Sequence, residues 1–230
     1  MNTDRRTIVV LAAAGIAVLW IADLSRSTWL RLAVLVPAVI LHEVSHGVVA
    51  LWFGDDTAKR AGRLTLNPIA HIDPVGSVAM PLLLAVAGAP IFGWAKPVPV
   101  NPRQLRNPRR QSLLVSLAGP ATNIVLAVAA ALVLRQATEM TLPIELLLWF
   151  GYLNVVLATF NLIPIPPLDG SAIIERFLPA QWWPGWLRLR QYSFFILFLL
   201  IFLLPGHYLD RLFNFSLDLW GRLWLPTSPT

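Results

Sequence analysis

Two histidines and one glutamate form the pattern His42-Glu43-Val44-Ser45-His46. If this stretch is helical, positions i and i+4 lie on nearly the same face, about 6 Å apart along the axis. Two imidazoles placed in this way can hold one Zn²⁺ ion, and the glutamate can take a proton from water at the metal. With four histidines in 230 residues, a chance match is expected in about one such sequence in a thousand. The motif therefore predicts a hydrolytic metal centre.

The motif lies inside an apolar run, Trp29–Phe53, that is long enough to cross a lipid bilayer. Ionisable groups at that depth are costly unless they are paired or hydrated, and they usually mark a functional site. A lone buried histidine is more often a hydrogen-bonded core residue, but that explanation does not cover two histidines and a glutamate together. We therefore interpret His42 and His46 as metal ligands and Glu43 as the general base.

A third ligand is needed, because catalytic zinc takes three protein ligands and keeps one position for water. The chain has no cysteine, so this ligand must be a histidine or a carboxylate. Glu139 and Glu145 flank a linker, and Asp55 and Asp56 lie in an expected loop. Asp169 follows three prolines at the end of a later apolar run, where irregular backbone needs protein or water around it. A hydrolase needs such a wet cavity, so Asp169 is the favoured candidate.

The composition indicates a membrane protein, because 57% of the residues are hydrophobic and only 13% are charged. We predict one all-α polytopic domain over 1–230, a bundle of about five to six transmembrane helices. Its catalytic core covers about 29–175, and a C-terminal helix with an interfacial amphipathic tail covers 187–230. The expected spans are Thr7–Leu24, Trp29–Phe53, Leu113–Leu134, Ile144–Ile163 and the shorter Tyr192–Leu204.

The apolar stretch Val75–Trp94 is interrupted by prolines and glycines, so it is not expected to form one straight helix. If this stretch is re-entrant, 13 basic residues lie inside and 5 outside, whereas a crossing would give 8 and 10. The positive-inside rule favours a re-entrant or broken segment near 75–102, a multi-pass protein of the cell membrane and a cytoplasmic N-terminus. The net charge of +6 then reflects cytoplasmic loops, and no nucleic-acid partner is expected.

The sequence resembles the site-2 protease family of intramembrane metalloproteases, in its compact bacterial branch without PDZ or CBS domains. The resemblance covers roughly residues 30–175. It implies one Zn²⁺ ion held by His42, His46 and Asp169, with Glu43 activating the zinc-bound water and Asn161 assisting near the substrate carbonyl. The matching motifs are His42-Glu43-x-x-His46, Asn67-Pro68-x-x-His71-x-Asp73-Pro74-x-Gly76, Gly93 to Pro102, Gly119-Pro120-x-x-Asn123 and Asn161 to Gly170.

The substrate implied by the resemblance is a single-spanning membrane protein, such as an anti-sigma factor or a signal-peptide remnant, cut within or beside the bilayer. Two alternatives stay open. A zinc transporter or zinc-binding membrane protein would not need Glu43 and would spread its ligands through both leaflets. An inactive relative would bind helices without cutting them, although the intact motif argues against it.

Three further features each have two interpretations. His71 either lines the cavity or supports the ligands, or it is a loop residue that hydrogen-bonds a turn. Asn123 either hydrogen-bonds across helices near the site or only packs beside Gly119-Pro120. The segment Lys96–Asn101 is rich in proline and should be extended, either as a strand that pairs with substrate or as a rigid linker.

Overall fold

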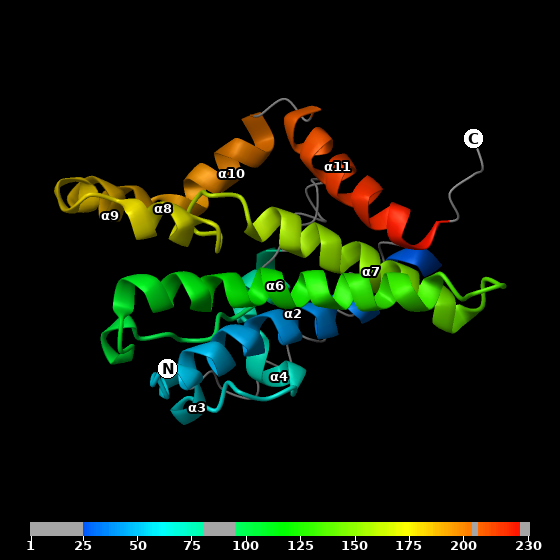
Figure 1. Cartoon of the computed structure of the whole chain (residues 1–230), viewed down its shortest axis with the longest axis horizontal. Coiled ribbons are helices and arrows are strands. Elements are labelled where there is room, and N and C mark those ends of the chain that lie inside the picture. Colours follow the sequence, from blue (N-terminus) through cyan, green and yellow to red (C-terminus); the bar gives the residue numbers. More distant parts are fainter. Residues whose placement is uncertain (1–24, 81–94, 204–206, 226–230) are drawn as a thin grey trace.

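The computed structural model describes residues 25–80, 95–203 and 207–225, which form an all-helical bundle (Figure 1). Three long helices build it: α2 (Arg26–Trp52), α6 (Pro108–Leu134) and α7 (Leu142–Asn161). Within the described ranges, these three are the helices long and apolar enough to cross a membrane. The prediction of an all-α membrane protein is confirmed. The first expected span, Thr7–Leu24, lies outside the described residues.

Helices α2 and α6 begin a few residues before their apolar runs because polar caps start them. The Ser25 hydroxyl accepts the Thr28 N–H at the start of α2, and the Asn107 side chain accepts from Arg110 at the start of α6, where Pro108 is the first helical residue. Helix α7 ends at Asn161, just before the proline-rich stretch, as the sequence predicted. Caps and prolines therefore set the helix ends, while the apolar runs set their middles.

Shorter helices connect and flank the bundle. The π-helical turn η1 contains the described start of the broken segment, whose residues 81–94 lie outside the described part. In chain order these helices are α3 (Thr57–Arg60), α4 (Pro68–His71), η1 (Pro74–Ala79), η2 (Pro102–Gln104), α8 (Ser171–Phe177), η3 (Ala180–Trp182), α9 (Trp183–Gln191), α10 (Ser193–Leu203) and α11 (His207–Trp224).

Helix α6 runs antiparallel to α2. His46, near the end of α2, bonds the Val115 carbonyl near the start of α6, while the earlier His42 bonds the later Asn123. The end of α2 and the start of α6 therefore lie at the same end of the bundle. The re-entrant hypothesis requires this arrangement, because a single crossing by 75–94 would make the two helices parallel.

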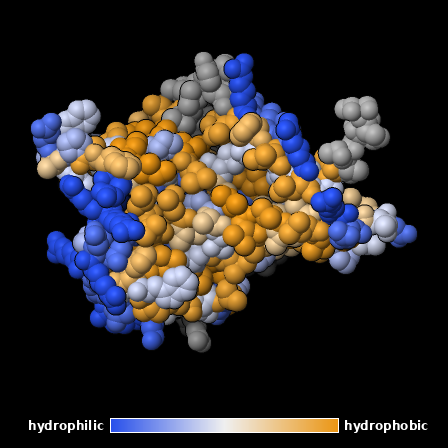
Figure 2. Space-filling view, in the orientation of Figure 1, coloured by the Kyte–Doolittle hydropathy of each residue, from blue (hydrophilic) through white to orange (hydrophobic). Residues whose placement is uncertain are grey.

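The surface of the bundle is apolar over its middle, and hydrophilic residues gather at the end that carries α3 and α9 (Figure 2). Basic residues are frequent in the sequence within and around residues 95–100, between the end of α2 and the first turn of α6. This distribution is the one expected when the middle of the bundle faces lipid. The basic residues are Lys59, Arg60, Arg63, Lys96, Arg103, Arg106, Arg109 and Arg110.

The C-terminal part of the chain forms two further helices, α10 and α11, in the expected region. Helix α10 has 11 described residues, about 16 Å of helix, and covers most of the expected Tyr192–Leu204 span. The expected amphipathic tail is a helix, α11, but this helix packs on the bundle. Its Trp220 is buried, donates through Nε1 to the Ala127 carbonyl of α6 at 2.7 Å, and lies against Gly151 of α7.

Candidate metal centre

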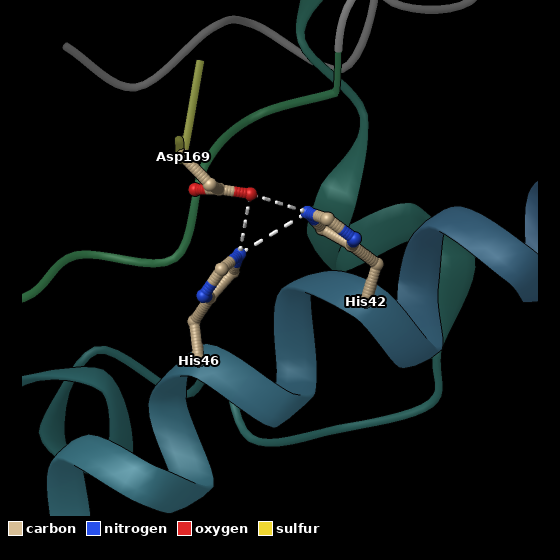
Figure 3. Close-up of side chains that lie close together, drawn as sticks. All are labelled: His42, His46 and Asp169. Carbon is tan, nitrogen blue, oxygen red and sulfur yellow. Dashed lines mark hydrogen bonds and ion pairs between the residues drawn. The ribbon is translucent and has the colours of Figure 1, made fainter. Parts of the chain in front are cut away.

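Helix α2 presents His42 and His46 one turn apart on the face that packs against α6. Their Nε2 atoms are 3.1 Å apart, and both side chains are buried (Figure 3). The ring centroids are 4.7 Å apart at an interplanar angle of 82°, so the two imidazoles meet at their edges. The predicted pairing of the two histidines on one helix face is confirmed.

Asp169 lies in the loop that follows α7, and backbone contacts hold this loop against the helix end. The Gly170 N–H donates to the Asn161 carbonyl at 2.7 Å. A Cβ atom at Gly170 would lie only 2.3 Å from the Leu162 carbonyl oxygen, so no larger residue fits without a shift. The prolines end the helix, and the glycine lets the chain fold back closely enough to aim Asp169 at the bundle.

The Asp169 carboxylate meets the two histidines. Its Oδ2 atom lies 3.1 Å from His42 Nε2 and 3.4 Å from His46 Nε2 (Figure 3). Among the described residues, these three form the group whose ligand atoms could hold one metal ion. Glu139, Glu145, Asp55 and Asp56 do not take part in it.

The hydrogen bonds around the cluster prepare it for a cation. His46 Nδ1 donates to the Val115 carbonyl at 2.7 Å, and His42 Nδ1 donates to the Asn123 amide oxygen at 2.5 Å. Two neutral imidazoles with these partners turn both Nε2 lone pairs toward the Asp169 carboxylate. Three acceptor atoms so close together repel one another unless a cation lies among them.

The spacing of these acceptors fits zinc. Ligand bonds of about 2.0–2.1 Å in a tetrahedral site place neighbouring ligand atoms about 3.3 Å apart. The observed separations are 3.1, 3.1 and 3.4 Å. Three protein ligands leave a fourth tetrahedral position, and the side chain of Asp169 is 20% exposed, so water can reach the site from its side.

Glu43 follows His42 on α2 and is held by the segment of residues 95–100, which has no regular secondary structure. The Val98 N–H donates to Glu43 Oε2 at 2.9 Å. This bond leaves the second carboxylate oxygen to act on water, and it limits the rotation of the side chain. Residues 95–100 have no regular secondary structure and Asn101 has an extended backbone, while the pairing of Lys96–Asn101 with substrate stays a prediction.

Two more contacts fix the ends of that segment. The Lys96 N–H donates to the His71 carbonyl at 2.8 Å, and the Asn101 N–H donates to Asp55 Oδ2 at 2.6 Å. Burial raises the pKa of Asp55, but the hydrogen bonds from Thr57 and Asn101 outweigh this effect and lower the pKa. The charged carboxylate therefore ties the segment to the end of α2 at neutral pH.

Replacing Val98 with proline should lower the turnover rate about 10- to 100-fold, because a hydrogen bond to a charged group contributes about 1.5–3 kcal/mol. Proline removes the N–H but suits the extended backbone between Pro97 and Pro99. Val98→Ala is the matched control, since it keeps the N–H. Steady-state kinetics and zinc content measure the effect, and an unchanged rate in Val98→Pro with zinc bound would contradict the assigned role of this bond.

The three remaining candidates from the sequence, Asn123, His71 and Asn161, make three different kinds of contact. Asn123 contacts His42 directly, as the first of its two interpretations expected. His71 is the buried last residue of α4, outside the metal cluster, where Nε2 donates to the Thr65 carbonyl at 2.8 Å. The Asn161 amide donates to the Leu157 carbonyl of its own helix at 3.0 Å. The roles of His71 near substrate and of Asn161 near the carbonyl stay predictions.

Sequence reasoning missed several groups that support the site. Asn154 bonds Asn123, the Val115 carbonyl bonds His46, and the Val98 N–H bonds Glu43. Only Asn154 carries a signal that could have been found, because a polar residue in the middle of an apolar, lipid-length helix is unusual. Backbone groups have no sequence signature of this kind.

Comparison with known proteins identifies the family. The model of peptidase family M50 matches residues 132–204. "Putative zinc metalloprotease YwhC" of Bacillus subtilis is 44% identical over 74% of this chain and 78% of its own length. "Putative zinc metalloprotease Rip2" of Mycolicibacterium smegmatis is 34% identical over 84% of this chain and 77% of its own length. The Rip2 protein of Mycobacterium tuberculosis is also 34% identical, over 86% and 72%. No solved structure matches the chain.

The chain belongs to peptidase family M50. It is a zinc metalloprotease, and zinc is its cofactor. The apolar helices make it a membrane protein. The similarity to the site-2 protease family inferred from the motifs is confirmed.

Proposed function

We propose that this protein hydrolyses peptide bonds of membrane-spanning substrates inside the lipid bilayer, as an intramembrane zinc endopeptidase. The observation that carries the proposal is the convergence of His42, His46 and Asp169 at the side of a membrane-length helix. His46 precedes the end of α2 at Trp52 by six residues, or about 9 Å. The reaction therefore takes place below the surface of one leaflet.

The division of chemical roles follows from the donor set. Zinc held by His42, His46 and Asp169 supplies Lewis acidity, which lowers the pKa of water and polarises the scissile carbonyl. Glu43 takes the proton from the attacking water and delivers it to the leaving amine. The Val98 N–H keeps the carboxylate in one orientation throughout. Asn161 is proposed to assist at the substrate carbonyl, as the resemblance implies.

The orientation in the membrane is also proposed. The site lies toward the end of the bundle formed by the end of α2 and the start of α6, where α3 and the first turn of α6 carry basic residues. By the positive-inside rule this is the cytoplasmic end of a cell-membrane protein, so Arg26 lies at the outer end of α2. A cytoplasmic N-terminus is part of the same proposal.

The proposed substrate is a single-spanning membrane protein whose helix unwinds to expose an amide. An anti-sigma factor and a signal-peptide remnant are candidates from the resemblance. Helical amides are already paired with one another, so a helix must open locally before water can attack its backbone. Catalysis inside the bilayer therefore favours substrate helices that open easily.

Purified protein in detergent should cleave a single-spanning substrate and lose this activity with a zinc chelator, and added zinc should restore it. His46→Ala and Asp169→Ala should lose both zinc and activity, as measured by metal analysis and product mass spectrometry. A soluble peptide with the same cleavage sequence is the control. Equal cleavage of both substrates would contradict the membrane-substrate proposal, and full zinc content in His46→Ala would contradict the ligand set.

A further inference from the structure

A chain of buried hydrogen bonds joins the three long helices at the metal centre. His42 Nδ1 of α2 meets the Asn123 amide oxygen of α6 at 2.5 Å. The Asn123 amide nitrogen donates to the Asn154 oxygen of α7 at 2.7 Å, and the Asn154 nitrogen donates to the Phe150 carbonyl at 2.8 Å. Both asparagines are fully buried. The chain ends on a backbone oxygen, which can only accept a hydrogen bond.

This last acceptor sets the direction of every bond before it. Because the Phe150 oxygen only accepts, the Asn154 nitrogen must face it, and the Asn154 oxygen must face Asn123. Asn123 then turns its nitrogen toward Asn154 and its oxygen toward His42. His42 must carry its proton on Nδ1, so the lone pair of Nε2 points at the metal position.

The two histidine ligands differ in the group that holds the proton on Nδ1. His46 donates directly to the Val115 carbonyl, a backbone oxygen whose polarity is fixed. His42 donates to an amide that would be free to rotate by 180° and offer its nitrogen instead. Asn154 removes that freedom, because a rotated Asn123 would bring its oxygen against the Asn154 oxygen.

We propose that Asn154 is a positioning residue for zinc, which acts through Asn123 to fix the tautomer and the ring orientation of His42. The proposal rests on the zinc site of the proposed function and adds a residue that touches neither metal nor substrate. The competing explanation is that Asn123 and Asn154 only hold α6 and α7 together, as polar pairs do in membrane bundles. The two explanations differ in their consequences for zinc affinity.

Loss of Asn154 should weaken zinc binding about 10- to 100-fold, the range measured for groups that orient metal ligands. In Asn154→Leu the Asn123 amide has no partner that fixes its direction, so a fraction of molecules presents a nitrogen to His42. A carboxylate at position 123 cannot present the wrong atom, since either of its oxygens accepts. Asn123→Asp added to Asn154→Leu should therefore recover most of the lost affinity.

The experiment compares three full-length variants with the wild type in detergent: Asn154→Leu, the double variant Asn123→Asp/Asn154→Leu, and Trp220→Phe. Zinc affinity is measured by competition with a chelator, and the ligand geometry by the absorption of the Co²⁺-substituted protein. Thermal unfolding of the zinc-free protein gives the stability of each variant. Trp220→Phe is the matched control, because it removes another buried bond, to the Ala127 carbonyl, far from the zinc ligands in sequence.

We expect weakened zinc binding and an altered Co²⁺ spectrum in Asn154→Leu, recovery in the double variant, and lower stability with unchanged zinc affinity in Trp220→Phe. A double variant that binds zinc no better than Asn154→Leu would overturn the proposal and leave a packing role. Unchanged zinc affinity in Asn154→Leu would overturn it as well. Either result leaves the proposed function intact, since that function is tested separately by the ligand variants His46→Ala and Asp169→Ala and by the comparison of membrane and soluble substrates.

Discussion

Replacing Glu43 with glutamine should lower the rate of peptide hydrolysis about 10²- to 10⁴-fold, the usual contribution of a general base. Each tenfold loss corresponds to about 1.4 kcal/mol of the activation barrier. Glutamine has nearly the same shape and can still accept the Val98 N–H through its amide oxygen. It cannot take a proton from water, so the chemical step fails while the fold and the metal site stay intact.

Zinc content separates this variant from the ligand variants. Glu43→Gln should bind one zinc ion per chain, because the ion is held by His42, His46 and Asp169. Membranes that carry Glu43→Gln should accumulate uncut substrate helices, which comparative membrane proteomics against the wild type would detect. Normal turnover by Glu43→Gln in the purified system would rule out the assigned role of Glu43.

Gly119→Ala should abolish zinc binding, although alanine is the better helix former by about 1 kcal/mol. A Cβ atom at this position of α6 would lie 2.4 Å from His46 Nε2 and 2.6 Å from His42 Nε2. The imidazoles cannot move away easily, because their Nδ1 atoms are bonded to Val115 and Asn123 on the other side. The methyl group would force apart the nitrogens that bind zinc.

Two other glycine variants control for the general effect of a methyl group. Gly151→Ala would place Cβ 2.3 Å from the Trp220 ring, so it should lower the unfolding temperature but leave zinc bound. Gly221→Ala meets nothing closer than 3.5 Å and should be neutral or slightly stabilising. Metal analysis and thermal unfolding measure all three variants. If Gly119→Ala binds zinc as tightly as the wild type, the close approach of α6 to the two histidines is wrong.

Local sequence patterns determined the chemistry and the main helices. The four-residue spacing of His42 and His46 places them on one helix face whatever surrounds the helix, because the helical repeat alone fixes this relation. The apolar runs predicted the central parts of α2, α6 and α7, because hydrophobicity and a length sufficient to span the bilayer are properties of a single segment. The prolines before Asp169 marked the end of α7 correctly for the same local reason.

The tertiary structure alone decided how these segments meet. Asp169 is separated from His42 by 127 residues, and only the packing of α2 against α6 and α7 brings the carboxylate to the imidazoles. The positions of Asn154 and Gly119 beside the site follow from that packing, as does the bond from the Val98 N–H to Glu43. Contacts between distant segments depend on shape and on backbone groups that every residue shares, so local sequence patterns do not reveal them. The local sequence patterns thus indicated the type of reaction, and the packing of three helices assembles the metal centre that performs it.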